Sequence, residues 1–326
     1  MKPSFIHLIL LLLTLGMIYS DLTVGFQGEI GISEIFGKEH SNLIFNEFRL
    51  PRVLSAIFAG AGLSIAGLIM QTLFRNPLAG PYLVGITPGA SFGIAVMLFA
   101  QPLLPFSSQN QELSTLTASI LGSLMALFIQ LLLNRGFEST TRLLLTGMVL
   151  SFLFAAGVDL LQNLGNIEQI KQFSLWGMGS FERVTTDQIF WLVCPVILGV
   201  FFIVWNRFGL DAYLLGDIVA TSSGTNVLRL RRLMIWIGAI VSGWITAFCG
   251  PVSFVGLIAP HVAKQVSKTE SHQKILFPSI LWGIFLCVTA DLLAHELIKG
   301  ITLQVNAISA LIGAPILIMS FRKMRG

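Results

Sequence analysis

Charge is scarce in this sequence. Only 11% of its 326 residues are charged and 54% are hydrophobic, whereas a soluble domain carries about 25% charged residues. So few charges could not cover the surface of a soluble protein of this length. The composition therefore excludes a cytosolic enzyme, a nucleic-acid-binding protein and a disordered scaffold, and it indicates a membrane protein with several spans. The net charge of +4 is better explained by membrane topology than by nucleic-acid binding.

Cysteine is also scarce, and neither a phosphate-binding loop nor a complete zinc-protease motif is present. Cys194, Cys249 and Cys287 all lie in apolar runs, so neither a disulfide framework nor a cysteine metal site is predicted. No G-x-x-x-x-G-K-[ST] phosphate-binding loop is present. The pair His295-Glu296 starts like a zinc-protease motif, but Lys299 occupies the position of the second histidine. We therefore expect no catalytic residues, no metal site and no resident cofactor in this chain.

Long apolar runs are abundant, and each is a candidate span because a helix of about 20 apolar residues crosses a bilayer. The runs predict an all-α polytopic protein with ten spans and a single transmembrane domain over residues 1–326. The spans are 5–20, 50–73, 83–100, 113–134, 142–163, 188–206, 233–250, 253–266, 274–297 and 305–321. The shortest, 253–266, is the weakest, and 5–20 could instead be a cleaved signal peptide.

The basic residues predict the orientation of these spans. If the N-terminus lies inside and every span crosses, 14 of the 20 Lys and Arg residues fall on the inner side. They are Lys2, Arg75, Arg135, Arg142, Arg207, Arg229, Arg231, Arg232, Lys264, Lys268, Lys274, Arg322, Lys323 and Arg325; the outer side holds Lys38, Arg49, Arg52, Lys171, Arg183 and Lys299. Because Lys and Arg accumulate on the cytoplasmic side, both termini are predicted to be cytoplasmic.

Glycine, proline and acidic residues mark further features of the spans. The stretches 75–90 and 250–261 interrupt the apolar pattern with Gly and Pro, and such breaks in two halves are typical of transport folds. Small residues in 59–67 predict close helix packing within one subunit, with a subunit interface as the alternative. Asp159, Asp291 and Glu296 lie near the outer span ends. They are weak evidence for ion coupling, so an ion-coupled carrier stays an alternative.

Two hydrophilic segments are candidate docking or pathway elements. The inner segment 207–232 is too polar to span and too apolar for a simple loop, so it is either a pair of short helices that dock a partner or an interfacial loop. The outer segment 164–187 contains Trp176, which is either an aromatic membrane anchor or part of a short amphipathic helix at a pathway mouth.

Several motifs together resemble one permease family. They are RLPRVLSAIFAGAGLSIAGLIMQTLFRNPLAGPYLVGITPGASFG (49–93), RLLLTGM (142–148), WGMGSF (176–181), LLGDIVATSSGTNVLRLR (214–231), PVSFVGLIAPHVAK (251–264), Ala290-Asp291 and ALIGAP (310–315). In this order and spacing they resemble the permeases of ABC importers for iron–siderophore complexes, haem and vitamin B-twelve. The resemblance covers nearly the whole chain.

The resemblance implies a type II ABC importer permease fold with ten helices per subunit. It implies a homodimer in a bacterial inner (cytoplasmic) membrane that works with two cytoplasmic ATPase subunits and a periplasmic or lipid-anchored substrate-binding protein. ATP and Mg would be bound by the ATPase, and membrane lipid would surround the spans, with no nucleic-acid partner. Ferric siderophore is the expected substrate, with haem or cobalamin as alternatives.

The resemblance also implies residue roles where the motifs match. Docking of the binding protein falls on Arg49, Arg52 and His295, with interfacial snorkelling of the two arginines as the alternative. Coupling to the ATPase falls on Leu214, Leu215, Gly216, Asp217, Ala220, Gly224 and Asn226 within segment 210–227. The cytoplasmic gate falls on Asn76, Leu78, Ser139, Thr140 and Thr141. Spans 142–163 and 305–321 and the helix near Trp176 would line the pathway.

Three positions depart from the family pattern. His295 stands where the family usually has Arg, segment 302–306 replaces its usual Glu-Leu-Pro-Val-Gly, and Ser223 stands where Leu is common. We therefore expect altered contacts at the outer mouth and a less apolar ATPase contact at Ser223.

Overall fold

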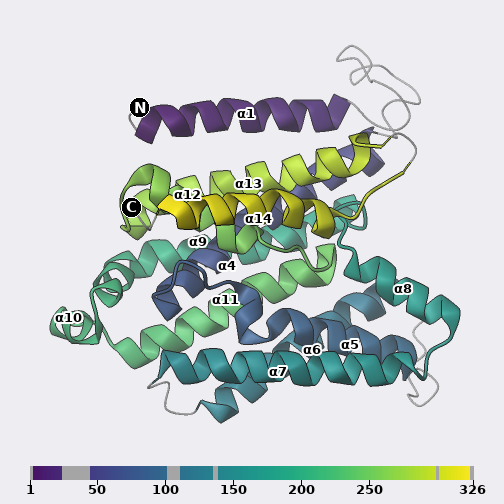
Figure 1. Ribbon diagram of the computed structural model, residues 1–326, viewed down its shortest axis with the longest axis horizontal. Helices are drawn as coiled ribbons and strands as arrows, with labels where there is room; N and C mark the ends of the chain where they lie inside the picture. The colour runs from purple at the N-terminus through teal and green to yellow at the C-terminus, as the bar shows by residue number, and fades with distance from the viewer. Residues whose placement is uncertain (1–2, 24–44, 101–110, 135–138, 299–300, 324–326) are drawn as a thin grey trace.

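The computed structural model describes residues 3–23, 45–100, 111–134, 139–298 and 301–323, and in these residues it contains helices and no strand. Figure 1 shows their arrangement. The elements are α1 (Pro3–Thr23), η1 (Phe45–Arg49), α4 (Leu50–Phe74), η2 (Pro81–Val84), α5 (Ile86–Phe99), α6 (Gln111–Leu133), α7 (Thr140–Gln162), α8 (Ile167–Gly177), α9 (Thr186–Leu214), α10 (Asp217–Ser222), α11 (Val227–Cys249), α12 (Val255–Ser267), α13 (His272–Glu296) and α14 (Val305–Lys323).

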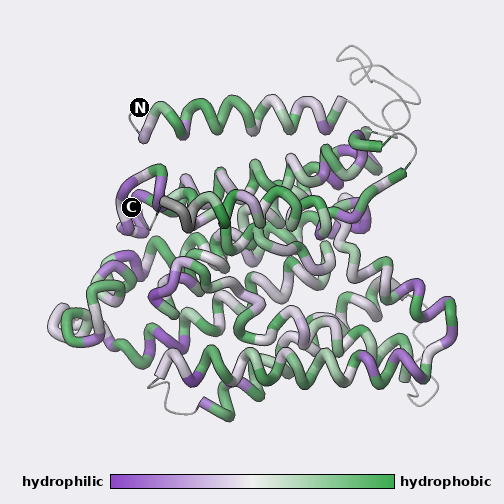
Figure 2. The backbone as a smooth tube through the Cα atoms, in the orientation of Figure 1, coloured by the Kyte–Doolittle hydropathy of each residue, from purple (hydrophilic) through white to green (hydrophobic). Residues whose placement is uncertain are grey.

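The helices confirm a polytopic all-α fold. Within the described residues, seven helices are long and apolar enough to cross a membrane, and Ile86–Phe99 and Val305–Met319 are shorter apolar helices. Together with α12 they account for the ten predicted spans. Figure 2 shows hydrophobic residues along the helices and hydrophilic residues concentrated near their ends, as a bilayer requires.

Helix α4 forms the centre of the bundle, where it packs against α9, α11, α12 and α13. Its glycines permit this because a Cβ at Gly60 would lie 2.4 Å from the carbonyl oxygen of Gly283 in α13. A Cβ at Gly67 would overlap the backbone of Gly256 in α12. The small residues of this helix therefore bring helices of one chain together, which confirms the prediction of packing within the subunit.

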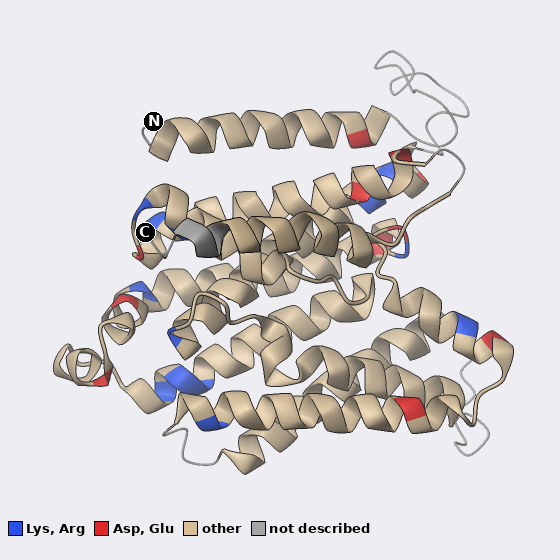
Figure 3. Ribbon diagram, viewed as in Figure 1, with Lys and Arg blue, Asp and Glu red and all other residues tan. Residues whose placement is uncertain are grey.

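The N-terminal end of α1 and the C-terminal end of α14 lie at the same end of the bundle as α10 (Figure 1). We call this the terminal end, and the end that holds α8 and the C-termini of α1 and α13 the opposite end. Lys and Arg are concentrated at the terminal end in Figure 3, as the predicted charge asymmetry requires. Lys2, Lys38, Arg135, Lys299 and Arg325 of that asymmetry lie outside the described residues.

The segment predicted as a cytoplasmic loop is shorter than expected. Helix α9 continues to Leu214 and α11 begins at Val227, so the basic residues at the two edges extend long helices. Only α10, six residues long, lies between them. Of the two alternatives for 207–232, a pair of short helices is wrong and a simple interfacial loop is incomplete, because polar residues continue α9 and α11 beyond the membrane core and one short helix lies between them.

The break predicted around 256–261 is also smaller than expected. Residues 250–254 separate α11 from α12, but α12 then runs through Pro260 without interruption. Residues 75–85, by contrast, form an irregular connection between α4 and α5 that contains the short helix η2.

Candidate functional sites at the two ends of the helix bundle

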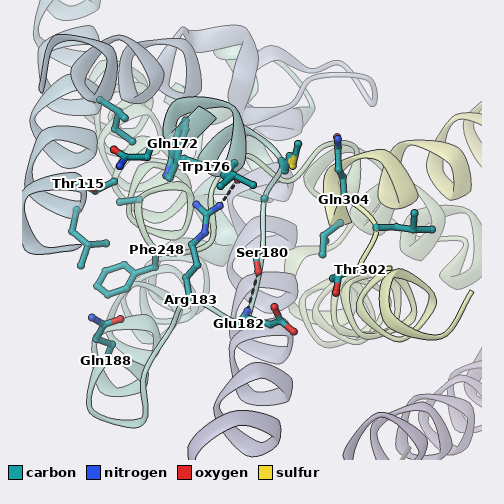
Figure 4. Close-up of a pocket in the computed structure, with 18 of the residues that line it drawn as sticks. Thr115, Gln172, Trp176, Ser180, Glu182, Arg183, Gln188, Phe248, Thr302 and Gln304 are labelled. Carbon is teal, nitrogen blue, oxygen red and sulfur yellow. Dashed lines mark hydrogen bonds between the residues drawn. The ribbon is translucent and has the colours of Figure 1, made fainter. Parts of the chain in front are cut away.

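A cavity of about 660 Å³ lies at the opposite end of the bundle. Figure 4 shows amide and hydroxyl side chains around it, together with Trp176, Phe248, Glu182 and Arg183. The lining residues are Ile94, Leu98, Thr115, Leu116, Gln172, Leu175, Trp176, Met178, Gly179, Ser180, Glu182, Arg183, Gln188, Ala247, Phe248, His295, Thr302, Leu303, Gln304 and Val305. They come from α5, α6, α8, the connection between α8 and α9, α9, α11, α13, the residues before α14 and the first residue of α14, and α7 is not among them.

The charged groups of this cavity are largely compensated by the chain itself. The Glu182 carboxylate lies 2.7 Å from Nε2 of His295, and this hydrogen bond holds the pKa of Glu182 below its ordinary value. The Arg183 guanidinium donates to the carbonyl oxygen of Leu175. The cavity wall is mostly apolar, with two aromatic side chains and a few amide, hydroxyl and charged groups, and it is suited to many weak contacts with a large ligand.

A buried charge cluster lies directly behind the cavity wall. Arg52 in α4 forms ion pairs of 2.7 Å with Asp21 of α1 and 3.0 Å with Asp291 of α13. Both carboxylates are fully buried. His295, one turn beyond Asp291, lies 2.8 Å from the carbonyl oxygen of Asp291 through Nδ1. The cluster therefore joins three helices and connects them to the cavity through Glu182.

The predicted docking arginines point into the protein. Arg49 donates to the carbonyl oxygens of Leu22 and Thr23 at 3.2 and 2.7 Å, and Arg49 and Arg52 are 5% and 7% exposed. Their guanidiniums are buried in protein, so the alternative of interfacial snorkelling is wrong. Their contacts with Asp21, Leu22 and Thr23 fix the C-terminal end of α1 against α4.

The predicted ion-coupling acids do not form one group. Asp291 is paired with Arg52 and Asp159 is exposed on α7. The second carboxylate beside Arg52 belongs to Asp21, which the sequence pattern did not single out.

Trp176 is a buried residue and not a membrane anchor. It is 4% exposed and packs with Phe173, which in turn contacts Phe99. Its helix α8 begins with a capping box between Asn166 and Gln169, which satisfies the first free N–H groups. The predicted short helix at a pathway mouth therefore exists, and Trp176 is part of the wall that it gives the cavity.

The altered segment 302–306 forms part of the cavity wall and is hydrogen-bonded to neighbouring elements. The N–H of Leu303 donates to the carbonyl oxygen of Ala294 at 2.8 Å. The Asn306 side chain accepts from the N–H of Ser253 at 3.1 Å, and its own N–H donates to the carbonyl oxygen of Met178. Asn306 thus connects α14 with α8 and the start of α12.

At the terminal end, Leu215 at the end of α9 and residues of α10 form an exposed apolar tip. Leu215 is 74% exposed and Ile218 is 83% exposed, with Val219 beside them. Ala220 is buried against the neighbouring helices, whereas Ser223 is exposed and its hydroxyl donates to the carbonyl oxygen of Ala220. An exposed apolar group of this kind, outside the apolar spans, is typical of a protein contact.

Glycines and caps shape the ends of this segment. Gly216 and Gly224 adopt left-handed φ values of 118° and 85°, which other residues rarely adopt. The Asn226 side chain accepts from the N–H of Arg229 and caps α11. Leu214 is half-buried at the last turn of α9. These residues determine how α10 projects from the two long helices.

Asp217 at the start of α10 is paired within the chain. Its carboxylate accepts hydrogen bonds from Arg75 at 2.5 Å and from Arg231 at 2.6 Å. Burial alone would raise the pKa of the Asp217 carboxyl, but the two guanidiniums outweigh it and hold the pKa below the ordinary value.

The predicted gate residues are also at the terminal end. Asn76 and Leu78 form a tight turn in which Oδ1 of Asn76 accepts from the N–H of Leu78 at 2.9 Å. Ser139 caps α7 by accepting from the N–H of Arg142, and Thr140 and Thr141 follow in the first turn of that helix. The structure therefore places these predicted residues at the same end as α10.

One hydrolase-like pattern occurs in the chain, at Gly89-Ala90-Ser91-Phe92-Gly93. It lies inside α5 and not on a strand-to-helix turn, and the Ser91 hydroxyl donates to the carbonyl oxygen of Thr87. A serine nucleophile needs a base within hydrogen-bond reach, and the contact found for this hydroxyl is a helical backbone carbonyl. The pattern therefore indicates helix packing through glycine.

Comparison with known proteins identifies a transport family and a solved structure with a matching fold. The model of the FecCD transport family matches residues 6–323. The hemin transport system permease protein HmuU of Yersinia pestis is 32% identical and aligns over 83% of this chain and 81% of its own. The ferric enterobactin transport system permease protein FepG of Escherichia coli K12 is 31% identical over 85% and 82%. A solved metal-chelate type ABC transporter in an inward-facing conformation matches with a TM-score of 0.86 and 28% identity, covering 98% of this chain and 99% of that chain.

Proposed function

Because this chain belongs to the FecCD transport family, a family of ABC transporter permeases, we propose that it carries ferric siderophore across a bacterial inner membrane. In this proposal two copies of the chain form the pathway. Two cytoplasmic ATPases bind at the terminal end, and a substrate-binding protein delivers the chelate at the opposite end. The chain itself performs no chemistry, because ATP and Mg are bound by the ATPase.

The observation that carries this proposal is the exposed apolar tip of α10 at the basic end of the bundle. Leu215 and Ile218 project away from the spans, and a carrier that works alone would need no such projection. A cytoplasmic ATPase with an apolar groove would cover these side chains, which supports an ATP-driven mechanism over an ion-coupled one. The roles proposed for Leu214, Gly216, Ala220, Gly224 and Asn226 are to shape and orient this contact.

The cavity at the opposite end supports a bulky chelate as the substrate. Its apolar side chains, amides, hydroxyls and aromatic rings offer many weak contacts, and its charged residues Glu182 and Arg183 are hydrogen-bonded within the chain, so a ligand can leave as readily as it enters. Two relatives are named for hemin and for ferric enterobactin, which are also bulky chelates. Haem and cobalamin are therefore the substrates against which ferric siderophore must be tested.

We propose that the binding protein docks at the opposite end, where Glu182 is half exposed and the buried His295 holds its carboxylate. Arg49 and Arg52 act there by fixing α1, α4 and α13, because their guanidiniums are buried. The transport cycle is alternating access, and switching a two-state equilibrium from 1:99 to 99:1 takes about 5.5 kcal/mol of differential binding. ATP and the loaded binding protein would supply this energy.

The first experiment is purification of the tagged chain from its native membranes in mild detergent, followed by mass spectrometry. We expect one P-loop ATPase per copy of this chain and hydrolysis of ATP by the complex. Proteoliposomes of this complex, supplied with the cognate binding protein, should then accumulate a ⁵⁵Fe-labelled siderophore in preference to haem or cyanocobalamin. Recovery of the chain alone, from a preparation that keeps other ABC complexes intact, would contradict the proposal.

A further inference from the structure

Arg75, the C-cap residue directly after α4, is fixed to the joint between α9 and α10 by three contacts. Its Nε donates to the carbonyl oxygen of Tyr213 at 2.8 Å, and its Nη2 donates to Asp217 at 2.5 Å. The guanidinium carbon also lies 4.0 Å from the centre of the Tyr213 ring, within the range of a cation–π contact. The carboxylate of α10 is thus connected directly to α4.

The backbone of Arg75 indicates that its side chain is specifically needed. Arg75 adopts φ 47° and ψ 38° at the C-cap of α4, a left-handed conformation in which glycine is the most favourable residue. An arginine at this position is conformationally unfavourable, and its side chain makes the contacts with Tyr213 and Asp217.

A second set of contacts holds the same joint on the other side. Arg231 of α11 donates to the second oxygen of Asp217 at 2.6 Å and to the Tyr213 hydroxyl at 3.0 Å. That hydroxyl donates to the carbonyl oxygen of Leu73 in the last turn of α4 at 3.0 Å. Tyr213 is fully buried, so the joint is a packed unit that includes α4, α9, α10 and α11.

The turn that follows Arg75 is short and hydrogen-bonded. The side chain of Asn76 accepts from the N–H of Leu78, and the N–H of Ala79 donates to the carbonyl oxygen of Asn76 at 3.1 Å. The N–H of Asn76 itself donates back to Gln71 in α4. A displacement of Arg75 would therefore move the turn at Asn76–Ala79 with it, since no flexible residue separates the two.

We propose that Asp217 and Arg75 transmit movement of α10 to the turn at 76–79, so that Asp217 acts inside this chain and not as a contact to the ATPase. This inference rests on the proposed function, because the ATPase is taken as the source of the movement. Asp217 and Arg75 are positioning residues: neither touches ATP or substrate. The apolar tip binds the partner, and the carboxylate at the start of the same helix carries the displacement to α4.

The test uses the complete complex, in which Leu78→Cys reports on the turn. Cys194 is exposed and is replaced by alanine, whereas Cys249 and Cys287 are buried and can stay. The measurement is the rate of maleimide labelling at position 78, with and without ATP and vanadate, together with ATP hydrolysis and chelate uptake. In the otherwise wild-type complex we expect the labelling rate to depend on nucleotide.

The decisive variants are Arg75→Gly and Asp217→Asn. Arg75→Gly relieves the left-handed backbone and removes the guanidinium, so the protein should fold and keep its ATPase. In both variants the labelling rate should stop responding to nucleotide. Uptake per ATP hydrolysed should fall about tenfold, since one charge-assisted hydrogen bond corresponds to about that factor. The double variant should be no worse than the worse single one, because both remove the same link.

Arg229→Ala is the matched control, since Arg229 is an exposed arginine on the first turn of α11 at the same end. It should leave the nucleotide response intact. A normal nucleotide response in Arg75→Gly or Asp217→Asn would overturn the inference while leaving the importer function in place. Absence of a copurified ATPase, or of any nucleotide response in the wild-type complex, would overturn the proposed function and the inference with it.

Discussion

Arg52 is the residue on which the opposite end of the bundle depends. One guanidinium compensates two fully buried carboxylates, Asp21 and Asp291. Removing one partner from a buried ion pair costs about 3–5 kcal/mol, because a charge is left without compensation. Arg52→Met should therefore lower the melting temperature strongly in detergent and reduce the yield of folded protein.

Asp21→Asn is the matched comparison for this prediction. It leaves the pair between Arg52 and Asp291 intact and removes one buried negative charge, so its loss of stability should be clearly smaller than that of Arg52→Met. Equal melting temperatures for the wild type and Arg52→Met would show that Arg52 does not stabilise the fold by compensating the two buried carboxylates.

Glu182 gives a prediction about pH. Its pKa lies below the ordinary value of 4.5, first because His295 donates a hydrogen bond to it. A carboxyl with a lowered pKa in the folded state stabilises the fold above its ordinary pKa and loses this contribution as pH falls through the folded value. The side chain is about half exposed, so the contribution is about 1 kcal/mol.

We therefore expect the melting temperature of the wild type to fall between about pH 5 and pH 3 more steeply than that of Glu182→Gln, because the amide cannot titrate. His295→Arg should keep the contact with Glu182. Parallel pH profiles for the wild type and Glu182→Gln would contradict this account.

At the residue scale, the sequence predicted positions better than partners. Arg49, Arg52 and His295 were singled out and do lie together near one end, but their contacts are inside the chain. Asp21 was missed because it follows the first apolar run and lies 31 positions from Arg52. Pairing at that separation depends on how helices pack, which composition and spacing do not encode.

Among the elements, α10 gives a prediction about partner binding. Ile218 is 83% exposed, so Ile218→Asp should change the stability of the chain by less than about 0.5 kcal/mol. The same change places a charge in the proposed apolar contact, and recovery of the ATPase in a pull-down should fall sharply. Thr221→Asp, an exposed position on the same helix, controls for added negative charge.

Gly216 gives a second prediction at this scale. A Cβ at Gly216 would meet nothing within 4 Å, yet its φ is 118°, so Gly216→Ala is disfavoured by backbone conformation alone, at about 1–2 kcal/mol. Gly16 in α1 also has open space but no unusual φ, and Gly16→Ala should be neutral or slightly stabilising. Transport and ATP hydrolysis should fall in Gly216→Ala and not in Gly16→Ala, whereas equal effects would argue against a special role for the turn at 216.

Helix number was predictable at this scale and helix ends were less so. Ten apolar runs became ten helices because a span needs a nearly constant length of apolar sequence. The ends of α9 and α11 were misplaced because basic residues such as Arg207 and Arg229 mark where the bilayer stops and not where the helix stops. The short helix α10 was found only as a polar segment with scattered apolar residues.

At the scale of the whole molecule, the arrangement of the ends fixes a topology that can be tested. The two termini and α10 share one end, and the connection around Gly165 between α7 and α8 lies at the other (Figure 1). The basic residues concentrated at the terminal end (Figure 3) predict that this end is cytoplasmic, since Lys and Arg accumulate there. A green fluorescent protein fused to either terminus should fluoresce, and alkaline phosphatase inserted after Gly165 should be active.

The two reporters must give opposite results at any one position, because the helices between the two ends cross the membrane. Fluorescence at the termini together with phosphatase activity at the termini would contradict the two-ended arrangement. Fluorescence after Gly165 with phosphatase activity at both termini would keep that arrangement but invert it, and α10 would then lie where no cytoplasmic ATPase could reach it.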